Sequence, residues 1–167
     1  MGCSASQASK PKAKKNDAIP AEQRVRINAI LDFWYKKSEM LPIDDMIKFW
    51  FMSTPEVDAE IVKNFMEDHT KFMNGDYSGW INDKDGALAA CILLDQWSRN
   101  MFRKDPRAFA SDAKVLEITL KVLANPTMYN SYSLHEKTWI IMPLVHSEDK
   151  TINSRMLVES EALGKDC

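Results

Sequence analysis

Polar side chains interrupt an otherwise apolar segment at LLDQWSRNMFR, residues 93–103. In a helix, Asp95 and Arg99 would lie one turn apart with the acid first, which is the favourable order for an ion pair on one face. Gln96 and Asn100 repeat this spacing one step around the helix. Guanidinium and amide groups placed in this way can orient an anionic or carbonyl ligand. The polar residues of the segment are Asp95, Gln96, Arg99, Asn100 and Arg103.

A second polar group ends another apolar segment, PLVHSED, and consists of His146, Glu148 and Asp149. Its carboxylates are candidates for the negative charge that Arg99 and Arg103 need, because two arginines four residues apart on a helix repel each other. His146 is also suited to proton exchange near neutral pH. One interpretation of the two segments is a polar ligand pocket in which Arg99 and Asn100 orient the ligand and His146 exchanges a proton.

The same residues admit a purely structural interpretation. Buried charges must be paired, so the charged residues of the two segments can satisfy one another in a network between helices. Such networks resemble functional sites because they also bring titratable groups together. From the residues alone we favour the structural network and keep the ligand pocket as the alternative. The members of that network would be Asp95, Arg99, His146 and Glu148.

No other motif indicates a particular chemistry. His69, His135 and His146 do not have the spacing of metal ligands. The chain has no G-x-S-x-G nucleophile motif and no glycine-rich phosphate loop, and its three cysteines are too far apart for a disulfide framework. We therefore assign no catalytic residue, metal or cofactor, and we favour a binding protein over an enzyme.

Apolar residues recur at helical spacing along most of the chain, and no segment alternates as a strand would. Ser53-Thr54-Pro55 and Ser133-Leu134-His135-Glu136 are helix-start signals, and Asn74-Gly75 is a stop signal. We expect Asp112 to cap a helix and Pro143 to kink another. The pattern predicts an all-α fold, an antiparallel bundle of paired, tetratricopeptide-like helices. The expected helices include residues 26–35, 44–52, 55–72, 87–102, 115–123, 138–146 and 150–163.

The first six residues, MGCSAS, match the N-myristoylation pattern M-G-x-x-x-[ST]. In this pattern the amine of Gly2 is acylated after the methionine is removed. A single myristoyl chain gives only reversible membrane attachment, so stable attachment takes a second signal. Cys3, next to the acylated glycine, is placed for palmitoylation. The sequence therefore predicts a doubly acylated N-terminus.

The charge of the chain is divided between this N-terminus and the rest. Residues 1–16 carry four lysines and no acid, whereas the remainder has 18 basic and 24 acidic residues, a net charge of −6. Lysines next to an acidic membrane leaflet strengthen attachment. We predict a disordered basic arm at residues 1–17 and a helical domain at 18–167. The lysines of the arm are Lys10, Lys12, Lys14 and Lys15.

These features predict a peripheral protein at the cytoplasmic face of a membrane. The arm would bind the acidic lipids of the inner leaflet, and grooves between the paired helices would bind a protein or peptide partner. An acidic body does not favour nucleic-acid binding. We therefore expect a lipid-anchored adaptor, and the alternative is a small enzyme or ligand-binding protein that uses the LDQWSRN and HSED segments.

Several segments of the chain resemble, in the same order, domain-of-unknown-function family 924. The resemblance covers roughly residues 27–150 and implies a small, all-α, tetratricopeptide-like protein, but it implies no reaction. Its most specific elements are the LDQ-x-x-RN-x-x-R and P-L-x-H-S-E-D patterns. The similar segments are ILDFWY (30–35), WF with VDAEI and F (50–65), GW (79–80), LLDQWSRNMFR (93–103), AFASDAKVLEIT (108–119) and PLVHSED (143–149).

Two departures from the family pattern affect the expected structure. Family members usually have proline where this chain has Ser98, so we expect a straighter helix after Trp97. Family members also continue past the H-S-E-D element into a further helical region with an Arg-Phe-Pro-His-Arg-Asn-like motif, which the sequence up to Cys167 does not contain. If that region covers Arg99 and His146 in the family, the pocket would be open or lost here.

Overall fold

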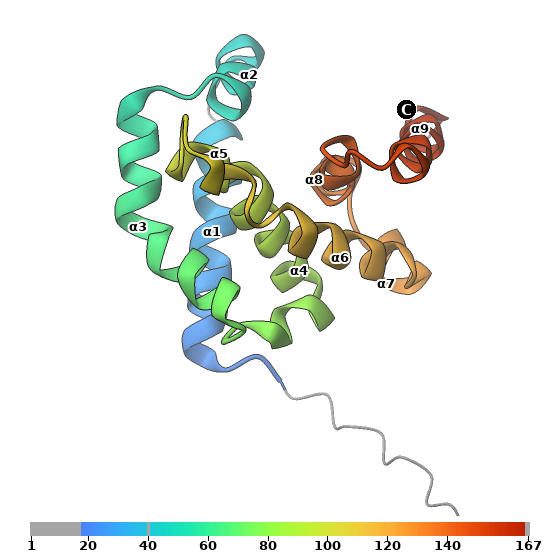
Figure 1. Cartoon of the computed structure of the whole chain (residues 1–167), viewed down its shortest axis with the longest axis horizontal. Helices are drawn as coiled ribbons and strands as arrows, with labels where there is room; N and C mark the ends of the chain where they lie inside the picture. Colours follow the sequence, from blue (N-terminus) through green and yellow to red (C-terminus); the bar gives the residue numbers. More distant parts are fainter. Residues whose placement is uncertain (1–17, 40, 166–167) are drawn as a thin grey trace, which may run out of the picture.

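The computed structural model describes residues 18–39 and 41–165 of the chain (Figure 1). Within these residues the chain forms helices joined by short links and no strand, which confirms the predicted all-α fold. The predicted arm, with its acylation sites Gly2 and Cys3, lies outside the described residues. So do its lysines, Lys10, Lys12, Lys14 and Lys15.

The N-terminal half consists of α1 (Ala21–Glu39), α2 (Ile43–Phe51) and α3 (Pro55–Asn74). α1 buries Ile27, Ile30 and Trp34, which follow the helical spacing of the sequence. α3 begins as predicted, with Thr54 as its N-cap, and ends at Gly75, whose φ of 93° suits a residue without a side chain. Figure 1 shows α3 running beside α1, with α2 at one end of the pair.

The predicted helix at 87–102 is interrupted by a wider turn. It consists of α4 (Lys84–Cys91), a π-helical segment η2 (Ile92–Gln96) and α5 (Trp97–Met101). In the π-helical segment the Trp97 amide donates to the Ile92 carbonyl, five residues back. The helix is therefore not the regular one we expected around Ser98. Ala87–Leu94 are all buried, as their apolar pattern indicates.

Ser98 has a specific structural role at this turn. Its hydroxyl lies 2.7 Å from the Leu94 carbonyl oxygen, and the Ser111 hydroxyl lies 2.6 Å from the same oxygen. His69 Nε2 is 2.9 Å from Ser98 Oγ, so α3 is joined to the turn as well. A proline at this position would remove the Ser98 hydroxyl that makes these contacts.

The C-terminal half begins with a 3₁₀ turn, η3 (Pro106–Phe109), and continues through short links. Ser133 and Glu136 form the predicted capping box at the start of α8. Asp112 does not cap α6 as expected, because it is the first residue of that helix and Ser111 takes the cap position. The remaining helices are α6 (Asp112–Leu123), α7 (Pro126–Asn130), α8 (Leu134–Val145) and α9 (Lys150–Lys165).

Aromatic rings fill the centre of the bundle and join its two halves. The Trp34 ring of α1 lies 4.8 Å from the Trp139 ring of α8, edge to face. Trp97 of α5 packs 4.4 Å from Phe65 of α3. This core brings the end of α8 close to the π-helical turn and the start of α6. No described helix combines the length and the hydropathy that crossing a bilayer requires.

Candidate functional site

The main polar cavity lies where η2, α5, the start of α6 and the end of α8 meet. It has a volume of about 530 Å³ and opens to solvent. Part of its wall is polar, and part is formed by apolar side chains. The residues that line it are Asp95, Arg99, Phe109, Asp112, Ala113, Val115, Leu116, Pro143, His146, Ser147 and Glu148.

Asp95 and His146 form the centre of the polar wall. The Asp95 side chain is 1% exposed, and its Oδ1 lies 2.8 Å from His146 Nδ1. Gln96 Nε2 donates to the other carboxylate oxygen at 2.5 Å. Because a carboxylate only accepts hydrogen bonds, Nδ1 of the histidine carries the proton toward Asp95. In the neutral ring, Nε2 then keeps its lone pair and can accept a proton.

Arg99 connects this pair to the start of α6. Its Nη1 donates to the Asp95 backbone oxygen at 2.6 Å, and the same nitrogen is 3.5 Å from the Asp95 carboxylate. Both terminal nitrogens reach the carboxylate of Asp112, at 3.3 and 3.2 Å. The guanidinium therefore has two acidic partners within the protein. It is a positioning group here, and little of its charge remains for an anionic ligand.

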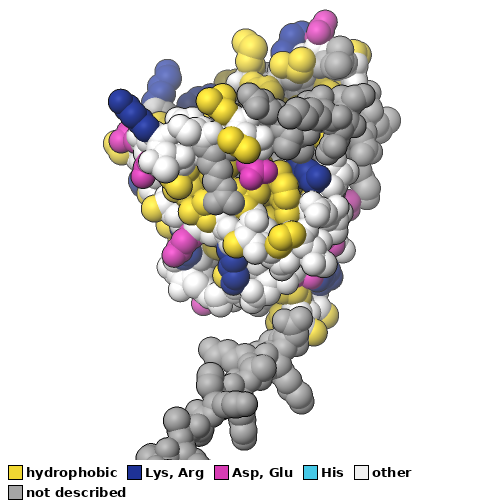
Figure 2. Space-filling view, turned by 90° about the vertical axis from the view of Figure 1, so that its right-hand side faces the viewer, with side chains coloured by type: hydrophobic (Ala, Val, Ile, Leu, Met, Phe, Trp, Pro, Cys, Tyr) yellow, Lys and Arg dark blue, Asp and Glu magenta, His cyan; other side chains and the backbone are white. Residues whose placement is uncertain are grey.

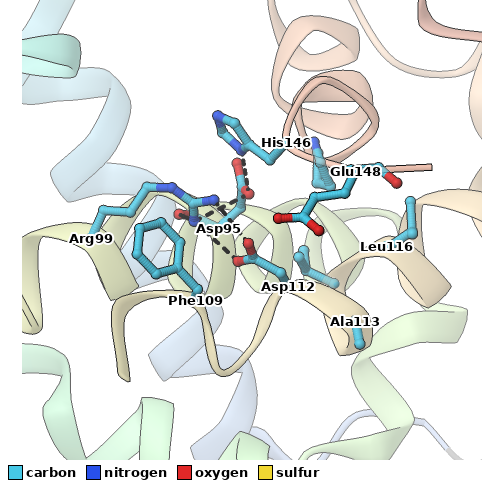
Figure 3. A pocket seen from close by; sticks show the side chains of 11 residues that line it. Asp95, Arg99, Phe109, Asp112, Ala113, Leu116, His146 and Glu148 are labelled. Carbon is cyan, nitrogen blue, oxygen red and sulfur yellow. Dashed lines mark hydrogen bonds and ion pairs between the residues drawn. The ribbon is translucent and has the colours of Figure 1, made fainter. Parts of the chain in front are cut away.

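Glu148 contributes a further negative charge to the cavity. Figure 3 shows the carboxylates of Asp95, Asp112 and Glu148 converging on the same space, beside the His146 ring. The Glu148 residue is exposed, and among the described residues its side chain forms no hydrogen bond or ion pair. Three carboxylates thus face one guanidinium, so the lining of the cavity has an excess of negative charge.

The environment of Asp112 is consistent with this imbalance. Burial raises the pKa of its carboxyl above the usual value, and the charge of Asp95 raises the pKa further. The guanidinium of Arg99 lowers it but does not compensate. A carboxylate in this situation is stabilised by any cation that enters the cavity.

Asn100 and Arg103 belong to a neighbouring cluster around Asp58. Arg103 Nε lies 2.6 Å from Asp58 Oδ2, and Asn100 Nδ2 lies 2.8 Å from Oδ1. The Ser53 hydroxyl donates to Oδ1 at 2.6 Å. Burial opposes ionisation of Asp58, but the bonds from Arg103, Ser53 and Asn100 outweigh it and lower the pKa of the carboxyl. The anion that Arg103 requires is therefore on α3, and not in residues 143–149.

The two clusters share a smaller cavity of about 160 Å³. Arg99 and His146 line both cavities, so they stand between the two. Of these two cavities, Gln96, Asn100 and Arg103 line only the smaller one. Glu148 lines only the larger one.

Asp149 has a different role from the one expected. Its carboxylate accepts the Thr151 amide at 2.8 Å and caps the start of α9. It is not among the residues that line either cavity. The predicted network is therefore formed by Asp95, Arg99 and His146, with Asp112 as its fourth member.

Sequence reasoning missed the two aspartates that pair with the arginines. Asp112 has the appearance of a helix cap, and Asp58 has the appearance of an ordinary acid in the first turn of α3. Only the tertiary fold brings Asp58 to Arg103, because 45 residues separate them. Within the part of the chain that the structure describes, no three acidic, histidine or cysteine side chains are arranged to bind a metal ion.

Comparisons with known proteins agree on the fold. The model of a family described as bacterial protein of unknown function (DUF924) matches residues 30–167. Among solved structures, a protein of unknown function from Agrobacterium tumefaciens is similar to the chain, with 22% identity and a TM-score of 0.74. The similarity covers 84% of this chain and 75% of the other. At this identity it shows a common fold. No curated protein matches the chain.

Proposed function

This chain belongs to the DUF924 family, and we propose that its helical body is an adaptor that receives a basic side chain of a partner protein in the Asp95–His146 cavity. The observation that carries the proposal is the carboxylate of Glu148, which has no partner among the described residues and lies beside two further carboxylates that share the Arg99 guanidinium. A lysine or arginine side chain fits this chemistry, because its charged end can reach the acids while its methylenes contact an apolar wall. Leu116 and Pro143 belong to that wall.

The charge balance distinguishes this ligand from the one expected from sequence. An anionic or carbonyl group would require Arg99 to give up Asp95 or Asp112, its present partners. A cation instead adds a partner to Glu148 and leaves the existing pairs in place. We therefore assign the cavity to a cationic group and keep Arg99 as a positioning residue.

We propose further that the basic arm attaches the body to the cytoplasmic face of a membrane. The amine of Gly2, once the methionine is removed, attacks a myristoyl thioester, forming an amide and releasing the thiol. Cys3 supplies the site for a second chain, and the lysines bind acidic lipid. Support for this part comes from the sequence pattern alone.

Exposed apolar side chains support a protein partner rather than a free metabolite. Leu134 and Val145 of α8 are 41% and 40% exposed, and Leu157 and Val158 of α9 are 58% and 66% exposed. Figure 2 shows hydrophobic side chains gathered in a hollow on the side of the molecule where these helices lie. A partner that covers this side could place one basic side chain in the cavity.

A titration of the whole chain with small capped amino acids tests the cavity. N-acetyl-arginine amide and N-acetyl-lysine amide are expected to shift the amide resonances of Ala113 and Glu148, whereas N-acetyl-norleucine amide is not. Glu148→Gln should weaken binding several-fold. Glu117→Gln, which removes an exposed carboxylate of α6 outside this cavity, should not. Equal shifts with the norleucine compound would contradict the charge-based assignment.

The Asp95–His146 pair also favours a second function, that of a small enzyme. A neutral histidine whose Nδ1 is held by a buried carboxylate at 2.8 Å is the arrangement of a general base. His146→Ala would abolish activity of this kind. Binding of the basic compounds without any turnover would leave the adaptor as the function.

A further inference from the structure

A second cavity, separate from the polar one, lies between the end of α3, the 3₁₀ helix η1 (Ser78–Asn82) and the outer face of α6. Its volume is about 390 Å³, and most of its wall is apolar. None of its residues takes part in the Asp95–His146 site. The lining residues are Phe72, Gly75, Ser78, Ile81, Lys114, Glu117, Ile118 and Lys121.

The floor of this cavity is formed by Phe72 and Ile118, which are 2% and 4% exposed. Gly75 adds no side chain, so the space above the floor stays open. The two lysines are held by other groups. Lys114 Nζ donates to the carbonyls of Phe72 and Met73, at 3.1 and 3.0 Å, and Lys121 Nζ donates to Asn82. Their methylene stems therefore form part of the wall, while their ammonium groups already have hydrogen-bond acceptors.

The chain enters the described structure beside this cavity. Ile19 Cδ1 lies 3.9 Å from the place that a Cβ on Gly79 would occupy, so the residues before α1 pack on η1. Ser78 and Ile81 of the same short helix line the cavity. Figure 1 likewise shows the start of α1 and the link between α3 and α4 at the same end of the molecule.

The length of the arm permits its first residue to reach the cavity. Between Gly2 and Ala18 an extended chain spans about 50 Å, far more than a neighbouring cavity requires. A tethered group at this distance has an effective concentration on the order of millimolar. An apolar group at the end of the arm would therefore meet the cavity often, even if its affinity were modest.

We propose that this cavity binds the acyl chain carried by Gly2 of the same molecule. The inference rests on the acylated arm of the proposed function and adds a site that withdraws the lipid from the membrane. A saturated hydrocarbon chain matches the wall, because it needs no hydrogen bonds and both lysine ammonium groups already donate to oxygen atoms of the protein. Membrane attachment would then be a competition between the bilayer and the cavity.

The test uses the full chain, myristoylated enzymatically in vitro with ¹³C-labelled myristate. Without vesicles, we expect nuclear Overhauser effects between the acyl chain and the side chains of Phe72, Ile81 and Ile118. Ser78→Trp, a change at an exposed position of the rim, should remove these contacts by filling the cavity. With vesicles of neutral phosphatidylcholine, this variant should partition several-fold more strongly than wild type.

Thr127→Trp places the same side chain at an exposed position of α7 and should leave both measurements unchanged. Acyl contacts confined to other residues, no contacts at all, or equal vesicle binding by wild type and Ser78→Trp would overturn the cavity assignment. Because the lipid is attached in vitro, these outcomes are independent of natural acylation. A natural protein with a free amino terminus would instead overturn the membrane anchor of the proposed function.

Discussion

His146 Nδ1 lies 2.8 Å from Asp95 Oδ1, and this contact joins the end of α8 to the π-helical turn 51 residues earlier in the chain. The π-helical turn widens the helix at the position of Asp95. The neighbouring Leu94 carbonyl accepts two hydroxyl groups, from Ser98 and Ser111. The same local geometry therefore fixes the backbone of the turn and the carboxylate that the histidine contacts.

Replacing Asp95 with asparagine should destabilise the protein. The Asp95 side chain is 1% exposed and contacts Gln96, Arg99 and His146, so loss of its charge weakens several hydrogen bonds at once. We expect the free energy of unfolding to fall by about 1–3 kcal/mol in urea denaturation. Asp149→Asn is the matched control, because asparagine caps a helix as well as aspartate does. Equal stability of both variants would contradict a structural role for Asp95.

Local sequence signals predicted the parts of the fold that depend on neighbouring residues. The caps at Thr54 and Ser133, the stop at Gly75 and the Asp95–Arg99 pair all follow from side chains within four positions of one another. Each is determined by the geometry of one helical turn, so no knowledge of the tertiary fold is needed.

The rest depends on contacts between distant segments. The π-helical turn relies on Ser111, 17 residues after Leu94, and the partner of Arg103 comes from α3. In the sequence Asp112 has the appearance of a helix cap, and this appearance hid its ion pair with Arg99. A sequence pattern can name the charged residues of such a site, but the fold decides how they pair.

The Asp58 cluster should respond to the removal of its arginine. Arg103 makes two of the short bonds that lower the pKa of the Asp58 carboxyl, so Arg103→Met is expected to raise this pKa. A carboxyl whose folded pKa is depressed stabilises the protein above its unfolded pKa, and this stability is lost as the pH falls through the folded value. NMR titration of the Asp58 carboxyl measures the shift. Arg107→Met is the control, since Arg107 pairs with Asp105.

His69 should make the protein less stable in mild acid. Burial lowers the pKa of this imidazole, so the unfolded chain binds a proton more readily than the folded one. The stabilisation linked to the neutral His69 side chain is complete above the pKa of the unfolded state, about 6.5. It is lost as the pH falls toward the lower pKa of the folded state. The loss is at most about 1.4 kcal/mol for each pH unit.

Unfolding in urea at pH 7.5 and pH 5.5 measures this loss when wild type is compared with His69→Gln. Glutamine can still bond to the Ser98 hydroxyl, but it does not titrate in this range. The difference in unfolding free energy between the two proteins should therefore change with pH. A constant difference at both values would show that His69 does not contribute to the pH dependence.

Gly86 should not tolerate any side chain. A Cβ at this position would lie 2.6 Å from the Trp80 carbonyl oxygen and 2.9 Å from the Trp80 Cα, both of which are backbone atoms of η1. Trp80 is fully buried and packs at 4.3 Å on Tyr77, so the turn has no room to move away. Gly86→Ala is expected to reduce the free energy of unfolding by about 1–3 kcal/mol or more. Gly79→Ala, whose Cβ would meet only Ile19 at 3.9 Å, should change it little. Unfolding of the two alanine variants at the same urea concentration would contradict the prediction that the close packing of α4 on η1 requires glycine at position 86.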